Sequence, residues 1–87
     1  MLKQFVFFYL MKNEPEKVGK IVPEHIKYWK GNRQINYSGG PFSDRSGGLI
    51  IFEEDNIDIA TELAMNDPFV VKELIEDKWV KEWIREE

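Results

Sequence analysis

The sequence predicts an α+β fold in which four strands and two helices follow one another in the order β-α-β-β-α-β. Two short segments, residues 4–11 and 48–53, consist largely of aromatic and β-branched residues, which favours strands. After each of them, apolar residues recur at intervals of three and four, the spacing of a helix with one buried face. The chain has 87 residues, 43% of them hydrophobic, which is enough for one core, so we expect a single domain over residues 1–87.

The first strand is predicted over residues 4–11, where the apolar character is continuous and both faces should be covered. The first helix begins near Asn13, because proline at position 15 is tolerated in a first turn. Pro23 interrupts the helical pattern, so we expect a kink or restart there. The helix ends at Gly31-Asn32, since either residue can take the left-handed C-cap conformation.

The second half of the chain contains the other four predicted elements. A strand over 34–38 is ended by Gly39-Gly40-Pro41, a loop follows over 42–48, and the third strand covers 48–53. Asn56 is a favourable N-cap for a helix that continues to about residue 66. Asp67-Pro68 ends this helix, because the residue before a proline is driven out of the helical region. A turn over 69–73 then leads to an aromatic last strand over 76–85.

Four antiparallel strands with both helices on one side form the ferredoxin-like arrangement. The helices cover only one face, yet the first and third strands have large apolar residues on both faces. An uncovered sheet would expose a larger apolar patch than monomers usually tolerate. A second copy of the sheet is the simplest cover. We therefore expect a homodimer through the helix-free faces of the first, third and fourth strands.

Composition argues against several classes of protein. The chain has no cysteine, which excludes disulfides, thiolate metal sites and a cysteine nucleophile. Its net charge is −4, and residues 53–87 contain twelve acidic against four basic residues, which argues against nucleic acid. No apolar stretch is long enough to span a membrane, and Lys12, Asn13 and Glu14 stand where a signal peptide needs small residues. We expect a cytoplasmic protein with no nucleic-acid or membrane partner.

Four short segments, in this order, resemble the YciI-like (YCII-related) proteins of the dimeric α/β-barrel superfamily. They are Pro23-Glu24-His25, Gly39-Gly40-Pro41-Phe42, Gly47-Gly48-Leu49-Ile50-Ile51 and Asn66-Asp67-Pro68-Phe69. Together with the final aromatic strand they span residues 1–85. The resemblance implies a dimer of back-to-back sheets and a pocket between helix and sheet for a small organic ligand. We expect no metal and no organic cofactor.

The resemblance also implies roles for individual residues. By motif, His25 is the candidate acid/base and Asp67 its orienting or proton-sharing partner. The candidate substrate-binding residues are Ser38, Gly40, Asp44 and Phe69. Family members often place an arginine before the proline of the histidine segment, where this chain has Val22, and Arg45 or Lys20 are the candidate substitutes for holding an anion. The expected activity is that of a cofactor-independent isomerase, lyase or dehydrochlorinase-like enzyme.

Each of these residues also has a purely structural interpretation. His25 lies on the buried stripe of its helix and could be satisfied by a backbone carbonyl. Asp67 continues an apolar stripe to a helix C-terminus, where the dipole disfavours a negative charge, and could be a turn residue bonded to the backbone beside Pro68. Ser38 and Asp44 could belong to a solvated loop. The alternative function is a non-catalytic, dimeric ligand-binding or structural module of the same fold.

Overall fold

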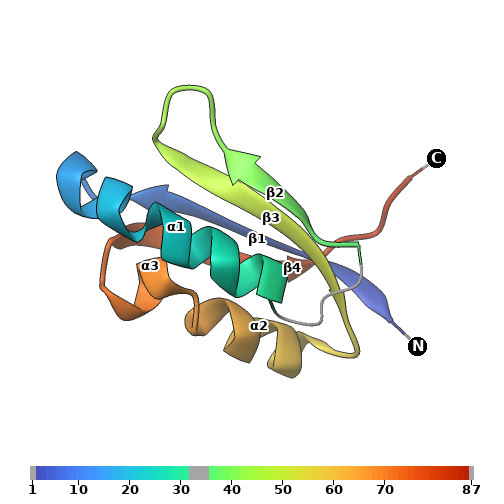
Figure 1. The fold of residues 1–87 in the computed structure, drawn as a ribbon. Helices are drawn as coiled ribbons and strands as arrows, with labels where there is room; N and C mark the ends of the chain where they lie inside the picture. The colour runs from blue at the N-terminus through green and yellow to red at the C-terminus, as the bar shows by residue number, and fades with distance from the viewer. Residues whose placement is uncertain (1, 32–35, 87) are drawn as a thin grey trace.

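The computed structural model describes residues 2–31 and 36–86 and confirms the predicted order of strands and helices, with one short helix added (Figure 1). The elements are β1 (Lys3–Met11), α1 (Pro15–Gly31), β2 (Ser38–Pro41), β3 (Gly47–Glu54), α2 (Ile57–Met65), α3 (Pro68–Val71) and β4 (Ile75–Glu82).

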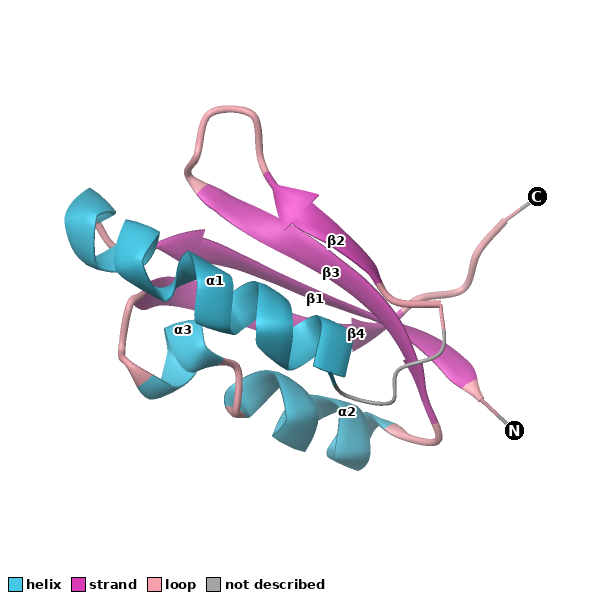
Figure 2. Cartoon of the chain, viewed as in Figure 1, coloured by secondary structure: helices cyan, strands magenta, loops and turns pink. Residues whose placement is uncertain are grey.

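The strands form one antiparallel sheet in the order β2-β3-β1-β4. β1 is therefore central, paired with β3 on one side and β4 on the other. All three helices lie on the same face of this sheet (Figure 2). This is the ferredoxin-like architecture that the sequence predicts.

The core lies between the helices and the inner face of the sheet. Phe5, Phe7 and Tyr9 alternate along β1 and are buried, as the period of two along a strand requires. Trp29 of α1 is fully buried against them, with its ring centroid 6.1 Å from that of Phe7 and 5.1 Å from that of Phe52 on β3. The aromatic content of β1 thus fixes where α1 packs.

The opposite face of the sheet has no covering helix among the described residues (Figure 2). Val6 and Phe8 point to this face, because they alternate with the buried residues of β1. Their cross-strand partners there are Leu49 and Ile51 on β3, and Trp79 and Lys81 on β4. Phe8 stacks on Trp79, with ring centroids 4.8 Å apart, and Trp79 remains 38% exposed. The two-sided apolar pattern predicted for β1 and β3 is confirmed.

The second strand was placed too early by the sequence pattern. Residues 34 and 35 of the predicted strand lie outside the described part of the chain, and residues 36 and 37 are not in a strand. The glycines and proline expected to end the strand form it instead, with Ser38 paired to Ile51 and Pro41 to Gly48. An edge strand tolerates proline because one row of its backbone groups faces away from the sheet.

The first helix continues through Pro23, so the predicted restart there is wrong. Pro23 lacks the N–H that would bond to the carbonyl of Gly19, which weakens an isolated helix. Burial of His25 and Trp29 on the next two turns offsets that loss, since tertiary packing supplies most helix stability in proteins. No helix of residues 2–31 and 36–86 is long and apolar enough to cross a membrane.

Candidate active site

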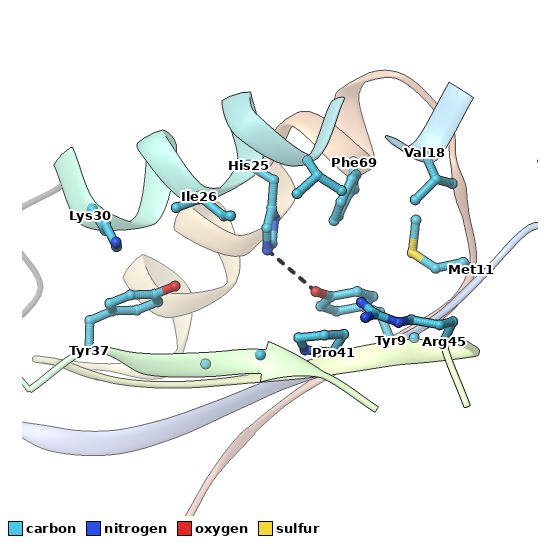
Figure 3. Close-up of a pocket in the computed structure, with 14 residues that line it drawn as sticks. Tyr9, Met11, Val18, His25, Ile26, Lys30, Tyr37, Pro41, Arg45 and Phe69 are labelled. Atoms are coloured by element: carbon cyan, nitrogen blue, oxygen red, sulfur yellow. Dashed lines mark hydrogen bonds between the residues drawn. The ribbon is translucent and has the colours of Figure 1, made fainter. Parts of the chain in front are cut away.

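A cavity of about 380 Å³ opens between α1 and the β2–β3 edge of the sheet (Figure 3). Its walls are mainly apolar and aromatic, with few polar groups. The residues that line it include Tyr9, His25, Lys30, Tyr37, Arg45 and Phe69. A cavity of this size and character is typical of a site for a small organic molecule.

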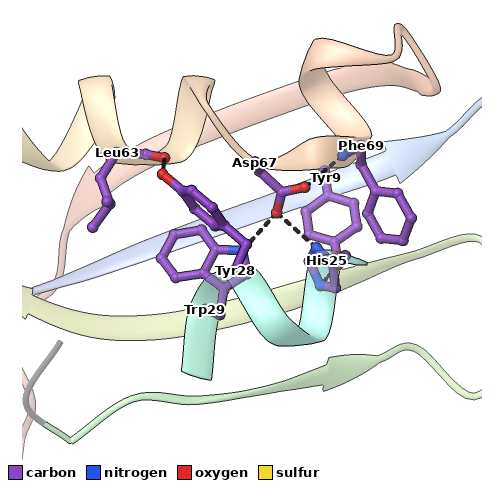
Figure 4. A network of polar contacts seen from close by, with 7 residues as sticks. All are labelled: Tyr9, His25, Tyr28, Trp29, Leu63, Asp67 and Phe69. Carbon is purple, nitrogen blue, oxygen red and sulfur yellow. Dashed lines mark hydrogen bonds and ion pairs between the residues drawn. The ribbon is translucent and has the colours of Figure 1, made fainter. Parts of the chain in front are cut away.

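His25 and Trp29 lie one turn apart on the same face of α1, because residues four apart share a helix face. Each has an aromatic ring with a nitrogen that can form hydrogen bonds. Both are buried, and both reach Asp67, which follows α2 in the chain (Figure 4). The indole Nε1 of Trp29 donates a 2.5 Å hydrogen bond to Oδ2 of Asp67. His25 Nδ1 lies 2.7 Å from the same oxygen. The structure thus brings together the two candidate catalytic residues.

Asp67 also caps the short helix α3. Its Oδ1 accepts a 2.7 Å hydrogen bond from the backbone N–H of Phe69. The sequence placed Asp67 at the unfavourable C-terminus of α2, but α2 ends at Met65, and Asp67 instead begins the next helix. Backbone N–H groups at a helix start favour a negative charge. Asp67 is 0% exposed, and its two oxygens are held by three groups, two from α1 and one from α3.

The contact between His25 and Asp67 fixes where a proton must lie. No described residue gives Nδ1 a hydrogen bond of good angular geometry, although Nδ1 and Oδ2 are only 2.7 Å apart. A lone pair on each of two atoms held this close would repel, so a proton lies between Nδ1 and Oδ2. A proton on Nδ1 leaves Nε2 of a neutral imidazole as a proton acceptor.

The Nε2 atom of His25 points toward the hydroxyl of Tyr9, 3.4 Å away (Figure 3). This distance is long for an O–H···N hydrogen bond, so the contact is weak. Burial, and after it the negative charge of Asp67, raises the pKa of Tyr9 well above its usual range. Tyr9 is therefore a neutral phenol at physiological pH, able to donate a hydrogen bond into the cavity.

Two neighbours hold the Tyr9 and His25 rings in place. Phe69 stacks on the imidazole of His25, with centroids 4.2 Å apart and planes 19° apart. On the sheet side, a Cβ atom at Gly48 would lie 2.6 Å from the Tyr9 hydroxyl oxygen, so glycine leaves the room that the phenol occupies. Packing, more than hydrogen bonding, thus orients the polar edge of the site.

The candidate substrate-binding residues are divided between three places. Gly40 and Phe69 line the cavity. Ser38 does not, and instead lines a second hollow beside Leu49 and Ile51. Asp44 lies in the exposed hairpin loop after β2, where hydrogen bonds from Ser46 lower its pKa. The structure therefore brings Gly40 and Phe69 to the His25–Asp67 pair, and neither Ser38 nor Asp44.

Sequence reasoning missed several residues of the site. Of the two candidate anion-binding substitutes, Arg45 lines the cavity and Lys20 does not, while Lys30 and Tyr37 line it without having been singled out. Burial, with the charge of Asp67 second, raises the pKa of Tyr37. The one feature of the sequence that could have indicated Lys30 as a cavity residue is its position on the same face of α1 as Ile26. No group of three or more His, Asp or Glu side chains among residues 2–31 and 36–86 could hold a metal ion.

A βαββαβ chain whose four-stranded antiparallel sheet has its helices on one face, with a ligand-sized cavity beneath the first helix, defines a small α+β protein of the ferredoxin-like class. The family model of the YCII-related domain matches residues 4–84. The chain belongs to this family.

Solved structures with a similar fold include a 5-chloro-2-hydroxyhydroquinone dehydrochlorinase from Burkholderia phenoliruptrix, in complex with 2,5-dihydroxybenzoquinone. It has a TM-score of 0.79 and 23% identity, with coverage of 99% of this chain and 96% of that chain. A dimeric ferredoxin-like protein of unknown function from Thermobifida fusca has a TM-score of 0.60 and 11% identity, over 95% and 90% of the two chains.

A cofactor-independent oxygenase from Streptomyces nogalater has a TM-score of 0.58 and 11% identity, over 99% of this chain and 94% of that chain. No curated protein matches the chain. At these identities, the similarity to solved structures establishes the fold and leaves the reaction to the site itself.

Proposed function

We propose that this protein is a cofactor-independent enzyme that moves a proton on a small organic ligand, with His25 as the acid/base. The observation that carries the proposal is the 2.7 Å approach of His25 Nδ1 to the fully buried Asp67, with the other edge of the imidazole facing a cavity. A carboxylate behind an imidazole fixes its tautomer and stabilises the imidazolium that forms when Nε2 takes a proton.

The remaining residues support this role in specific ways. Trp29 and the backbone N–H of Phe69 donate to Asp67, so the carboxylate keeps its orientation while His25 changes charge. Tyr9 stays neutral and is 3.4 Å from Nε2, where its hydroxyl can donate a hydrogen bond to a ligand. A proton acceptor and a hydrogen-bond donor thus face one cavity.

The reactions of proteins with the same fold narrow the choice of reaction. One is a dehydrochlorinase of a chlorinated hydroxyhydroquinone, and another is a cofactor-independent oxygenase. Loss of HCl from such a ring takes a proton from each of two ring hydroxyls and adds one to the carbon that bears chlorine, from which chloride leaves with its bonding electrons, so that the ring becomes a quinone. An imidazole can accept one of these hydroxyl protons and return a proton to the carbon. We propose a lyase or isomerase acting on a small hydroxylated organic molecule.

The proposal is tested with 5-chloro-2-hydroxyhydroquinone as the first substrate and chloride release as the readout. We expect turnover that falls by at least about a hundredfold in His25→Gln, the usual contribution of a general acid/base. Native mass spectrometry of the purified protein is the second measurement, because it detects a bound small molecule whatever the reaction. Bound ligand without turnover of it or its relatives would favour the non-catalytic binding module.

We also propose that the protein is a homodimer through the helix-free face of its sheet. Val6, Phe8, Leu49 and Ile51 form a continuous apolar patch there, and a protein of similar fold is described as dimeric. Covering such a patch with its own copy satisfies both molecules at once.

A further inference from the structure

We propose that the cavity binds a small, flat organic anion, whose negative charge is held by Arg45 or by Lys30. The inference deepens the proposed function, since it names the class of ligand that His25 would act on. It is drawn from the charge, the shape and the unpaired cations of the cavity.

The charge of the cavity wall is opposite to the charge of the protein. The chain has 16 acidic against 12 basic residues, and yet the cavity lining, within residues 2–31 and 36–86, includes Lys30 and Arg45 and no carboxylate. The nearby acid, Asp67, is fully buried behind His25, and both of its carboxylate oxygens already have partners within the protein. A ligand entering the cavity therefore meets positive charge.

The two cations have no carboxylate partner among residues 2–31 and 36–86. The ion pairs there are Lys3 with Glu82, Lys17 with Glu14, and His25 with Asp67. In an acidic protein, two cations at one apolar cavity without counter-charges are available to a ligand. Arginine and lysine both bind carboxylates and other oxyanions through charge-assisted hydrogen bonds.

The shape of the cavity selects a flat ligand. Val18, Val22 and Ile26 of α1 form an apolar wall, and the rings of Tyr37 and Phe69 offer faces for stacking. On the sheet side, β2 lines the cavity with Gly39, Gly40 and the ring of Pro41, so no long side chain of β2 enters it. The flat rings that line the cavity therefore suit an aromatic or conjugated system.

The two cations lie at opposite ends of this space. Figure 3 shows Lys30 beside Tyr37 at one end, Arg45 beside Met11 at the other, and His25 between them. An acidic group held at either end leaves the rest of the ligand beneath the imidazole. Recognition of the anion and proton transfer thus occur at separate points of one cavity.

The backbone of the β2–β3 hairpin holds Arg45 in this position. Arg45 has a φ of 64°, a left-handed conformation that costs energy for a residue with a Cβ. Its N–H donates to the carbonyl of Phe42 at 2.9 Å, and Asp44 accepts from the N–H of Ser46 at 3.0 Å. The loop thus holds an unfavourable backbone conformation at the residue through which it brings a cation to the cavity.

The test compares benzoate with benzamide, a neutral molecule of the same shape, by NMR titration of the ¹⁵N-labelled protein at neutral pH. We expect benzoate to bind in the cavity about tenfold more tightly, equivalent to ~1.4 kcal/mol. The double variant Arg45→Gln, Lys30→Gln should bind benzoate no better than benzamide. Both residues are exposed, so the variant should fold. Lys20→Gln, which removes a charge from α1 outside the cavity, is the matched control and should bind benzoate as the wild type does.

Equal affinity for the two probes, no cavity binding of benzoate at millimolar concentration, or full benzoate affinity in the double variant would each overturn the proposal. His25→Gln separates this proposal from the proposed function. It should still prefer benzoate to benzamide, because both cations remain, even if no substrate of the wild type is ever turned over.

Discussion

Asp67 shows how one residue can satisfy two interpretations that look exclusive in the sequence. It is a turn aspartate, since it caps α3 through Phe69, and it is also the partner of His25. The turn could be predicted from the proline that follows. The contact with α1 could not, because it depends on the packing of two elements far apart in the chain. Trp29 also donates a hydrogen bond to Asp67, and the sequence did not indicate it because tryptophan was expected in the apolar core.

Replacing Asp67 should therefore cost stability as well as function. Asp67→Asn puts an amide group, half of it a donor, where three donors converge. We expect a loss of about 2–4 kcal/mol in the free energy of unfolding, the scale of breaking a buried charged network. Urea unfolding measures it, and Asp44→Asn, which alters an exposed loop carboxylate, should change stability by less than about 0.5 kcal/mol. Equal stabilities of the two variants would contradict the network.

Tyr9 gives the protein a specific alkaline sensitivity. Its folded-state pKa lies above the ordinary 10.0, because burial and Asp67 disfavour the phenolate. The folded state therefore keeps a proton that the unfolded state loses, so the stabilisation is complete below about pH 10 and is lost as the pH rises further. We expect urea midpoints to fall from pH 9 to pH 11 less steeply in Tyr9→Phe than in the wild type. Parallel curves would argue that Tyr9 is not buried as a phenol.

At the scale of elements, β2 is where sequence reasoning failed. Alternation of residue types favoured a strand over 34–38, but the observed strand contains Gly39, Gly40 and Pro41, which have little strand propensity. Its strand conformation comes from pairing with β3, a tertiary interaction. The two strands whose side chains carry their own signal, β1 and β3, were located correctly. The weak strand is also the one that forms a wall of the cavity.

Two glycines of the β2–β3 hairpin, Gly48 and Gly40, differ in how much room their surroundings leave for a side chain. A Cβ atom at Gly48 would lie 2.6 Å from the Tyr9 hydroxyl and 2.9 Å from the carbonyl oxygen of Gly40, whereas one at Gly40 meets nothing within 4 Å. We expect Gly48→Ala to destabilise the fold by about 1–3 kcal/mol, the usual cost of overpacking, and Gly40→Ala to be nearly neutral. Thermal unfolding compares the pair. A neutral Gly48→Ala would mean that Tyr9 can move without cost.

α1 contains two glycines, Gly19 and Gly31, and no contact requires either of them. A Cβ at Gly19 would meet no atom within 4 Å, and its φ is not positive. We expect Gly19→Ala to stabilise the protein by about 0.5–1 kcal/mol, because alanine loses less backbone entropy in a helix interior. Gly31→Ala, at the last residue of the helix, is the control and should gain less. A destabilised Gly19→Ala would show that the helix needs flexibility before Pro23.

At the scale of the whole molecule, the architecture was predictable because it depends on the apolar patterns of the two strands at the centre of the sheet, β1 and β3. The alternating burial of β1 and the apolar residues on both its faces follow from Phe5–Met11 alone. A sheet with apolar residues on both faces needs a layer of helices on one face and a second cover on the other. The cavity was less predictable, since its cations come from a helix and a loop whose approach only the fold determines.

The helix-free face of the sheet needs a cover of its own, and a second copy of the chain can supply it. Phe8 stands near the centre of the helix-free face, stacked on Trp79 and opposite Leu49. A stable interface buries about 1,200–2,000 Å² in total, and a charge at its centre without a partner costs several kcal/mol. We therefore expect a wild-type dimer in sedimentation equilibrium and a shift toward monomer in Phe8→Lys. Ile59→Lys places the same charge at an exposed apolar residue of α2, on the helical side, and should leave the dimer intact. A folded wild-type monomer at micromolar concentration would show that the open face needs no partner.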